Sequence, residues 1–203
     1  MIAIIDYGVG NLRSVEKAFH FIGAEANISS DKREILKADA VVLPGVGAFE
    51  EAMDRLDKAG MIDVVKETIE GNKPFLGICL GMQLLFDYSE EGNGKTKGLG
   101  ILKGSIKQLP ADMNLKVPHM GWNSLKTGSN CTLFQNLPSN PYVYFVHSYY
   151  LTAEDRTIVA ATTDYGIEFD VAVNKGNLYA TQFHPEKSGK VGLSMLRNFV
   201  SIV

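Results

Sequence analysis

Short apolar strands alternate with amphipathic helices through the first half of the chain, and this alternation limits the possible folds more than any other feature. Strands are expected at Ile2–Asp6, Ala26–Ile28, Ala40–Leu43 and Pro74–Cys79. Short apolar runs separated by helices are typical of a parallel sheet that is buried on both faces. The first half therefore predicts an α/β fold in which helices cover both sides of a mainly parallel sheet.

Helices are expected between and after these strands, where apolar residues recur at helical spacing. In chain order they span Gly10–Ile22, Asp31–Lys37, Phe49–Ala59, Met61–Ile69 and Leu80–Tyr88. Asp31 is a suitable N-cap, because its carboxylate can accept hydrogen bonds from the free N–H groups of the first helical turn.

The second half of the chain has a different character. Ser89–Gly98 is polar and glycine-rich, which predicts an exposed loop. β-rich runs follow at Ile101–Leu109, Met120–Leu125, Val143–Leu151, Thr157–Thr163, Phe169–Asn174 and Leu178–Phe183, and a helix is expected at Ser188–Ile202. The turn Asn174–Asn177 predicts a hairpin between the last two strands. Since no linker divides the chain, we expect residues 1–203 to form one α/β domain with an antiparallel extension.

Composition excludes several classes of function. The 203 residues carry a net charge of −3, which gives no electrostatic basis for binding nucleic acid or an anionic membrane. No apolar run approaches the roughly 18–20 residues that span a bilayer, and the N-terminal residues lack the basic region of a signal peptide. Cys79 and Cys131 are the two cysteines, too few for a disulfide framework or a zinc site. We therefore expect a cytoplasmic protein without a metal or other cofactor.

The strongest local signal is the sequence Gly-Ile-Cys-Leu-Gly at Gly77–Gly81, where a buried strand is expected to meet a helix. A nucleophile on such a sharp turn projects from the carboxyl end of the strand, and flanking glycines keep the turn uncrowded. The positive end of the following helix favours a thiolate, and the backbone N–H of Leu80 would point at a developing oxyanion. We therefore predict that Cys79 is a nucleophile, with a buried structural cysteine as the alternative.

A cysteine nucleophile for acyl transfer needs a base and a group that orients the base. His184 ends an apolar strand and is followed by Pro185 and Glu186. Because proline stops the strand, the histidine and the glutamate can both face the same end of the sheet, where the carboxylate would hold the imidazole tautomer. His119 and His147 also remain candidate bases, and a strand-end histidine beside a solvated glutamate is the alternative for the pair.

A third feature is the sequence Pro-Gly-Val-Gly-Ala-Phe at Pro44–Phe49, at the carboxyl end of the third strand. Glycine-rich turns in this position let the backbone approach a ligand. A backbone N–H here could be a second oxyanion donor, and such donors typically contribute about 2.7–4 kcal/mol in the transition state. A tight strand–helix connection would also explain the glycines. The earlier glycine loop, Gly8–Arg13, fails the dinucleotide fingerprint, because Arg13 stands where the last glycine is required.

These segments together resemble the class I, or triad-type, glutamine amidotransferases, in which similar turns carry the cysteine and the His-Pro-Glu sequence. A closer similarity is to a branch of this family that supplies ammonia for histidine biosynthesis. It rests on Asp6–Ser14, Pro44–Gly47, Pro118–Asn123 and Gln182–Ser188, and the resemblance runs from the first strand to the last helix. It implies a three-layer, flavodoxin-like open sheet. Many relatives have Pro-Gly-Gly where this chain has Pro-Gly-Val-Gly.

The resemblance implies a catalytic triad in which Cys79 attacks the side-chain amide of glutamine, with His184 as base and Glu186 as its partner. The oxyanion hole would consist of the backbone N–H of Leu80 and the Val46–Gly47 peptide, which would reorient on activation. The glutamine substrate would be held by Gln83, Ser148 and Tyr149. Residues near the partner interface and the ammonia exit would be Arg13, His119, Met120, Trp122 and Asn123.

The implied partner is a (β/α)8-barrel cyclase in a heterodimer. It would use the ammonia on a phosphorylated ribulosyl intermediate and release imidazole glycerol phosphate and an aminoimidazole carboxamide ribotide. Three other functions remain open. The chain could be the glutaminase subunit of another synthase, such as the pyridoxal phosphate or anthranilate systems. It could be a flavodoxin-like cysteine hydrolase or peptidase that acts alone, or a binding module in which Cys79 is structural.

Overall fold

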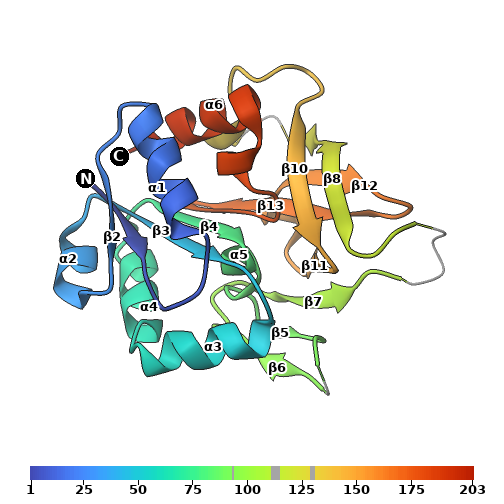
Figure 1. Cartoon of the computed structure of the whole chain (residues 1–203). Helices are drawn as coiled ribbons and strands as arrows, with labels where there is room; N and C mark the ends of the chain where they lie inside the picture. Colours follow the sequence, from blue (N-terminus) through green and yellow to red (C-terminus); the bar gives the residue numbers. More distant parts are fainter. Residues whose placement is uncertain (93, 111–114, 129–130) are drawn as a thin grey trace.

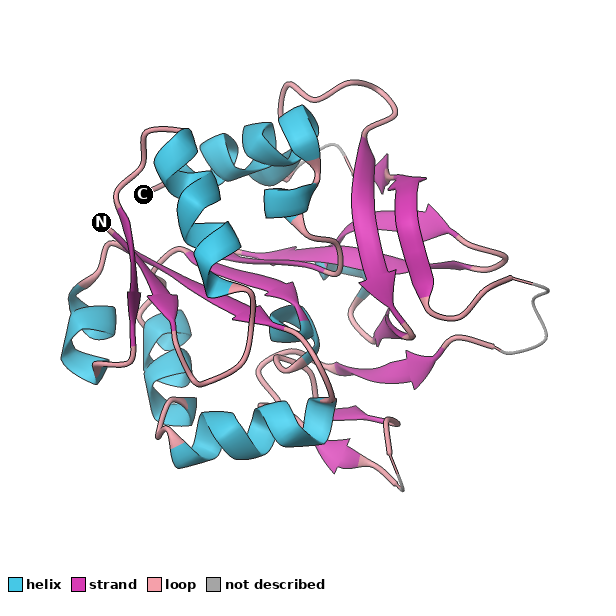
Figure 2. Cartoon of the chain, viewed as in Figure 1, coloured by secondary structure: helices cyan, strands magenta, loops and turns pink. Residues whose placement is uncertain are grey.

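The computed structural model describes residues 1–92, 94–110, 115–128 and 131–203, and its main element is a large mixed sheet (Figures 1 and 2). Within these residues the sheet has 12 strands, and its main path follows the order β2-β1-β3-β4-β14-β13-β11-β7-β5-β6. The parallel part comprises β2 (Ala26–Ser29), β1 (Ile2–Ile5), β3 (Ala40–Gly45), β4 (Phe75–Cys79) and β14 (Leu178–Thr181). The strands predicted for the first half of the chain are confirmed.

The antiparallel extension begins where β13 (Glu168–Lys175) pairs with β14. It continues through β11 (Tyr149–Ala153), β7 (Gly104–Gln108), β5 (Tyr88–Ser89) and β6 (Thr96–Lys97), with β12 (Val159–Asp164) and β9 (Lys126–Thr127) at its side. Only β5 runs parallel to its neighbour β7 in this part. A separate antiparallel pair joins β8 (His119–Ser124) to β10 (Tyr142–His147). The predicted α/β fold with an antiparallel extension is confirmed.

Helices cover both faces of the parallel strands, as Figure 1 shows. One face carries α1 (Leu12–Phe21) and α6 (Gly189–Val200), and the other carries α2 (Lys32–Lys37), α3 (Phe49–Lys58) and α4 (Ile62–Glu70). Strand β1 shows how the sequence divides between the two cores. Ile2 and Ile4 pack on the α1 and α6 side, whereas Ala3 and Ile5 pack on the other, because successive side chains of a strand point to opposite faces.

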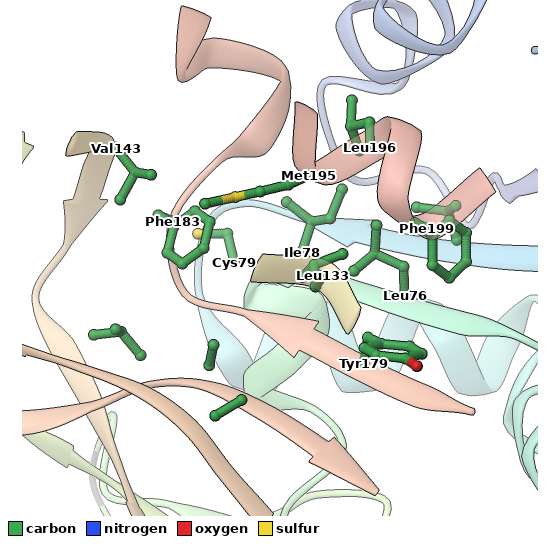
Figure 3. Packing of buried hydrophobic residues seen from close by; sticks show 14 of the residues in the cluster. Leu76, Ile78, Cys79, Leu133, Val143, Tyr179, Phe183, Met195, Leu196 and Phe199 are labelled. Carbon is green, nitrogen blue, oxygen red and sulfur yellow. The ribbon is translucent and has the colours of Figure 1, made fainter. Parts of the chain in front are cut away.

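Helix α6 packs on the strands that lead to the nucleophile turn. Figure 3 shows Met195, Leu196 and Phe199 of α6 beside Leu76 and Ile78 of β4, in one buried cluster that extends to Cys79. Burial of a large apolar side chain typically stabilises a protein by about 1.5–3 kcal/mol. This cluster therefore fixes the end of β4 from which the cysteine projects.

The helices differ from the predictions most clearly after β4. Leu80–Tyr88 was expected to be one helix, but α5 spans only Leu80–Gln83. The cause lies in Leu99–Leu102, whose backbone N–H groups donate to the carbonyl groups of Leu84, Leu85 and Phe86 at 2.8–3.1 Å, while Gly98 N donates to Asp87 O at 2.9 Å. Because these carbonyl groups accept from a later segment and not from the next turn of a helix, α5 ends after a single turn. The other predicted helices are present, and Asp31 caps α2 by accepting from Arg33 N and Glu34 N.

The run Val143–Leu151, expected as one strand, is divided between two sheets. Its first half belongs to β10, where His147 pairs with His119, and its second half belongs to β11, where Tyr149 pairs with Gln108. Both halves are apolar because both pack against cores, so the hydropathy pattern shows no break. Because β10 and β11 pair with different strands, Ser148, which lies between them, is brought to the carboxyl end of the parallel strands.

Three short 3-10 turns complete the described structure. They are η1 (Thr132–Phe134), η2 (Arg156–Ile158) and η3 (Pro185–Lys187). The expected loop Ser89–Gly98 includes the β5–β6 hairpin, and its residue 93 lies outside the described residues. In the described parts of the chain, no helix has both the length and the apolar character needed to cross a membrane.

Candidate active site

Cys79 occupies a strained turn between β4 and α5. Its φ is +57° and its ψ is −112°, a region that residues with a side chain seldom adopt and that costs of order 1–3 kcal/mol. Strain of this kind persists only where surrounding structure imposes it. The result is a nearly buried thiol that projects from the end of the strand at the start of a helix, as the sequence predicted.

The glycines around this turn are required by close approach of the backbone. A Cβ atom at Gly81 would lie 1.9 Å from the carbonyl oxygen of Leu43 in the adjacent strand, and one at Gly77 would lie 3.0 Å from the carbonyl oxygen of Gly81. Any side chain at Gly81 would therefore push β3 away from the turn. The tight packing of β3 against α5 also places the Val46–Gly47 segment beside Cys79.

His184 and Glu186 form a buried pair next to the cysteine. Nδ1 of His184 lies 2.8 Å from Oε1 of Glu186, so Nδ1 carries a proton that it donates to the carboxylate. Three hydrogen bonds hold the backbone of the histidine: its N–H donates to Tyr144 O at 3.1 Å, and its carbonyl oxygen accepts from Ser188 Oγ at 2.6 Å and from Lys187 N at 3.0 Å. Nε2 of His184 is buried and has no hydrogen-bond partner among the described residues, so it is free to exchange a proton in the site.

The electrostatics of the site favour a protonated imidazole. Burial opposes protonation of His184, but attraction to the nearby sulfur of Cys79 and to the hydrogen-bonded carboxylate of Glu186 outweighs it and raises the histidine pKa to about 9. A thiol and an imidazole in this relation can exist as a thiolate–imidazolium pair at neutral pH. The pair supplies a nucleophile and an acid at the same time.

A cavity of about 330 Å³ opens in front of the thiol. Its walls combine residues from the segment after β3 and from α5, β10 and β11, so segments far apart in sequence meet there. The cavity wall includes most of the residues that the sequence placed in an active site: Val46, Gly47, Cys79, Leu80, Gln83, Ser148, Tyr149 and His184. The volume lies near the lower end of the range for small-molecule sites.

Glu91 also lines this cavity, although no sequence pattern pointed to it. The residue belongs to the glycine-rich loop after β5, where its Oε2 accepts a hydrogen bond of 2.8 Å from Phe49 N at the start of α3. An acidic residue at a helix N-terminus is electrostatically favourable. Glu91 also adds a carboxylate to a cavity that Ser148 and Tyr149 line as well.

The orientation of the Gln83 side-chain amide is fixed by two hydrogen bonds. Its Nε2 donates to Tyr149 O at 3.2 Å and to Gln182 Oε1 at 2.8 Å. An amide nitrogen has two N–H groups, so both are used within the protein. Only the oxygen of Gln83 is left for a ligand in the cavity, and this oxygen can accept a hydrogen bond but cannot donate one.

His119 and His147, the other candidate bases, are bonded to each other, although His147 also lines the cavity. Nδ1 of His119 lies 2.8 Å from Nε2 of His147, and Nδ1 of His147 lies 2.9 Å from Tyr149 O. Burial lowers the pKa of His119 to about 4 and that of His147 to about 3. Both nitrogens of His147 are engaged and both rings are neutral, so His184 is the histidine that the geometry leaves available to Cys79.

The residues predicted at a partner interface lie in different environments. Met120 and Trp122 of β8 are 65% and 56% exposed, and Arg13 on α1 is also exposed. His119, in contrast, is buried and stacks on Tyr165 with ring centroids 4.0 Å apart. Asn123 is partly buried and donates to Asp164 O at 2.8 Å. Alternation along β8 therefore presents Met120 and Trp122 outward and holds His119 inside.

A family model described as glutamine amidotransferase class-I matches residues 3–203. The chain belongs to the class I glutamine amidotransferase family. It is 51% identical over 203 residues to the imidazole glycerol phosphate synthase subunit HisH of Caldanaerobacter subterraneus subsp. tengcongensis, covering 100% of this chain and 98% of that protein. It is 52% identical over 204 residues to the subunit of the same name from Syntrophotalea carbinolica, covering 98% of each chain.

Solved structures share the architecture at lower identity. A crystal structure of a glutamine amidotransferase superposes with a TM-score of 0.76 at 19% identity, covering 100% of this chain and 98% of the other. A chain of the PurLQS structure from Thermotoga maritima superposes with a TM-score of 0.75 at 19% identity, covering 99% and 97%. These likenesses establish the class I glutamine amidotransferase fold that the sequence predicted.

Proposed function

We propose that the chain is the glutaminase subunit of an imidazole glycerol phosphate synthase, acting as one amidotransferase domain over residues 1–203 in the cytoplasm. Glutamine is hydrolysed to glutamate and ammonia, and the ammonia serves histidine biosynthesis. The observation that carries this proposal is the strained Cys79 turn beside the buried His184–Glu186 pair. It occurs in a chain about half identical, over its full length, to subunits of that name.

The catalytic steps follow from the protonation state of the pair. The Cys79 thiolate attacks the side-chain carbonyl carbon of glutamine and forms a tetrahedral adduct. The C–N bond then breaks, and the His184 imidazolium gives its proton to the leaving nitrogen, which departs as ammonia. Neutral His184 next takes a proton from the water that attacks the thioester carbon. Cleavage of the C–S bond releases glutamate and restores the ion pair, while Glu186 keeps the imidazole oriented.

Substrate recognition is assigned to groups around the cavity. The backbone N–H of Leu80 and the Val46–Gly47 peptide stabilise the oxyanion. Gln83, Ser148 and Tyr149 hold the α-amino-acid end of glutamine. The carboxylate of Glu91 and the free oxygen of Gln83 are both acceptors, which suits the ammonium group of the substrate.

The pH dependence of the reaction is expected to follow His184. Its pKa of about 9 lies above the ordinary 6.5, so the protonated form is present at neutral pH and is lost as the pH rises through about 9. We expect kcat for glutamine hydrolysis to fall on that alkaline limb, because the leaving nitrogen loses its proton donor. The contribution of His184 protonation to folding is full below pH 6.5 and is lost over the same range. A kcat that stays constant from pH 8 to 10.5 would contradict this assignment.

The ammonia acceptor in this proposal is a (β/α)8-barrel cyclase bound as the second subunit of a heterodimer. Pro118 lines the cavity, and Met120 and Trp122 expose large apolar side chains on the adjoining strand β8. Apolar side chains of this size on a surface are typical of protein interfaces. A partner seated on β8 would cover one wall of the cavity, and ammonia would leave past Trp122 without entering solvent. Arg13, His119 and Asn123 complete the proposed interface region, His119 as a support beneath it.

The experiment that tests this function measures glutaminase turnover of the purified chain alone and with the barrel cyclase and an analogue of its phosphorylated substrate. We expect very low turnover of the isolated chain and an increase of about 100-fold in the complex, the effect of completing one oxyanion donor. The motivating feature is Val46, a residue with a side chain in the oxyanion segment. Full turnover without the partner would contradict the proposal that the Val46–Gly47 peptide reorients on activation. It would favour a hydrolase that acts alone. Stable binding to a different synthase and none to the barrel cyclase would favour another glutaminase subunit.

A further inference from the structure

Gln182 is a fully buried polar side chain that reaches the sulfur of Cys79. It follows the last residue of β14, and its Nε2 lies 3.8 Å from Cys79 Sγ, within hydrogen-bonding range for a sulfur acceptor. Its backbone N–H donates to Val171 O at 2.8 Å, so the main chain at this position is fixed by the sheet. Gln182 does not line the cavity, and no catalytic step described above uses it.

The direction of this amide is determined by a backbone carbonyl. Tyr149 O can only accept, so the Gln83 atom that approaches it at 3.2 Å must be the nitrogen. The second N–H of Gln83 then points at Gln182 from 2.8 Å, and the atom that receives it must be the oxygen. The remaining atom of the Gln182 amide is Nε2, which therefore presents an N–H to Cys79. Because Tyr149 O can only accept a hydrogen bond, it determines the orientation of the Gln83 amide, and that amide in turn determines the orientation of the Gln182 amide.

We propose that Gln182 is a catalytic residue that stabilises the Cys79 thiolate by donating an amide hydrogen bond to its sulfur, and that Gln83 is the positioning residue that holds this donor. The inference deepens the proposed function, since it concerns the same nucleophile.

The chemistry of the site explains why such a donor is useful. A nearly buried thiolate has lost most of its contact with water, and a hydrogen bond to an ionised acceptor is stronger than one to a neutral acceptor. His184 supplies a proton that is later transferred to the leaving nitrogen, whereas an amide N–H does not ionise. Gln182 would therefore favour the thiolate in the free enzyme and again as the C–S bond breaks.

The test is the pH profile of Cys79 alkylation by iodoacetamide in the full chain, read by mass spectrometry of the modified peptides. Gln182→Glu keeps the shape and the oxygen that accepts from Gln83 but removes the N–H that faces the sulfur. Gln182→Leu removes the N–H without adding a charge. We expect both profiles to move to higher pH by about one unit, which means roughly tenfold slower alkylation on the rising limb. Glutamine kinetics in the complex should show kcat about tenfold lower with KM within about twofold, because Gln182 does not line the cavity.

Two controls separate this role from a structural one. Thr181→Val removes the neighbouring buried hydroxyl, which donates to Phe183 O at 3.0 Å, and should leave the Cys79 profile unchanged. Cys131 reports folding in the same sample, because its thiol is buried and burial raises its pKa; it should stay unmodified while the fold is intact. Gln83→Leu keeps residue 182 itself and should move the Cys79 profile in the same direction, because the amide is no longer held.

The inference is overturned if the Cys79 profiles of the Gln182 and Gln83 variants coincide with that of the wild type while Cys131 remains protected. It is also overturned if Thr181→Val moves the profile as far as Gln182→Leu does. The outcome is independent of the proposed function, because alkylation requires neither glutamine nor the partner. A wild-type chain that releases ammonia from glutamine, with unchanged profiles in the variants, would retain the function and remove only the role of Gln182.

Discussion

Replacing Cys79 with alanine is expected to abolish glutamine-dependent synthesis by the complex, with a loss of at least about 10⁴-fold, the scale on which removal of a covalent nucleophile acts. Synthesis supported by added ammonia should survive, because ammonia bypasses the thioester and reacts in the partner. Alanine retains the Cβ atom and so leaves the strain at φ +57° unchanged. The measurement is the initial rate of the synthase with glutamine and, separately, with an ammonium salt at high pH.

Cys131 provides the matched control for this substitution. It is the other buried, free cysteine among the described residues, and it lies at the start of η1, away from the cavity. Cys131→Ala should leave both activities close to those of the wild type. If Cys79→Ala lowers the glutamine and ammonia activities equally, Cys79 has a structural role and the proposed chemistry is wrong.

The substitution Glu186→Gln should lower glutaminase kcat by about 10³- to 10⁴-fold, the range that accompanies loss of the carboxylate behind a catalytic histidine. The amide is nearly isosteric with the carboxylate but uncharged. The attraction that raises the pKa of His184 is reduced, while burial of the ring continues to oppose protonation. The imidazolium is therefore less populated at neutral pH, and the amide no longer selects one tautomer. Glutaminase activity of the complex, measured from pH 6 to 10, should show a small residual rate whose alkaline limb begins at lower pH.

The control for Glu186→Gln is the same chemical change at an exposed position. Glu51 accepts from Arg55 at 2.8 Å on the surface of α3, where an ion pair contributes little. Glu51→Gln should therefore leave kcat and the pH profile unchanged. A Glu186→Gln variant within threefold of the wild type would show that the carboxylate is not required to orient His184. Ammonia-dependent synthesis by the same variant checks that the complex still assembles.

Much of the fold could be predicted because its signals are local. The apolar runs of β1 to β4 and the helical spacing of α1, α3, α4 and α6 report burial on one or both faces, and burial depends on the layer that each element joins. Element ends were less predictable. The helix after Cys79 ends at Gln83 because Leu99–Leu102 captures the next carbonyl groups. Nothing within residues 80–88 shows that a segment ten residues later will do so.

The residues of the candidate site also differ in whether the sequence could predict them. The Gly77–Gly81 turn and the His-Pro-Glu sequence could be identified from sequence, because each places a reactive side chain at the end of a strand. Glu91 could not, because its loop has no pattern that directs a carboxylate into a cavity. Gln182 appeared only as part of a motif. Its contact with Cys79 depends on the side chain of Gln83 and the carbonyl group of Tyr149, which lie in other parts of the chain.

The parallel strand–helix framework, the cysteine on its glycine-flanked turn and the histidine–glutamate pair could all be derived from the sequence, since these depend on periodicity and on neighbouring residues. Three further features follow from tertiary contacts alone: which histidine is available to Cys79, which carboxylate enters the cavity and which amide faces the sulfur. The two groups of features differ because they depend on interactions of different range along the chain. Secondary structure follows from interactions over a few residues, whereas the protonation and orientation of a buried polar group depend on all the groups that surround it, wherever they lie in the chain.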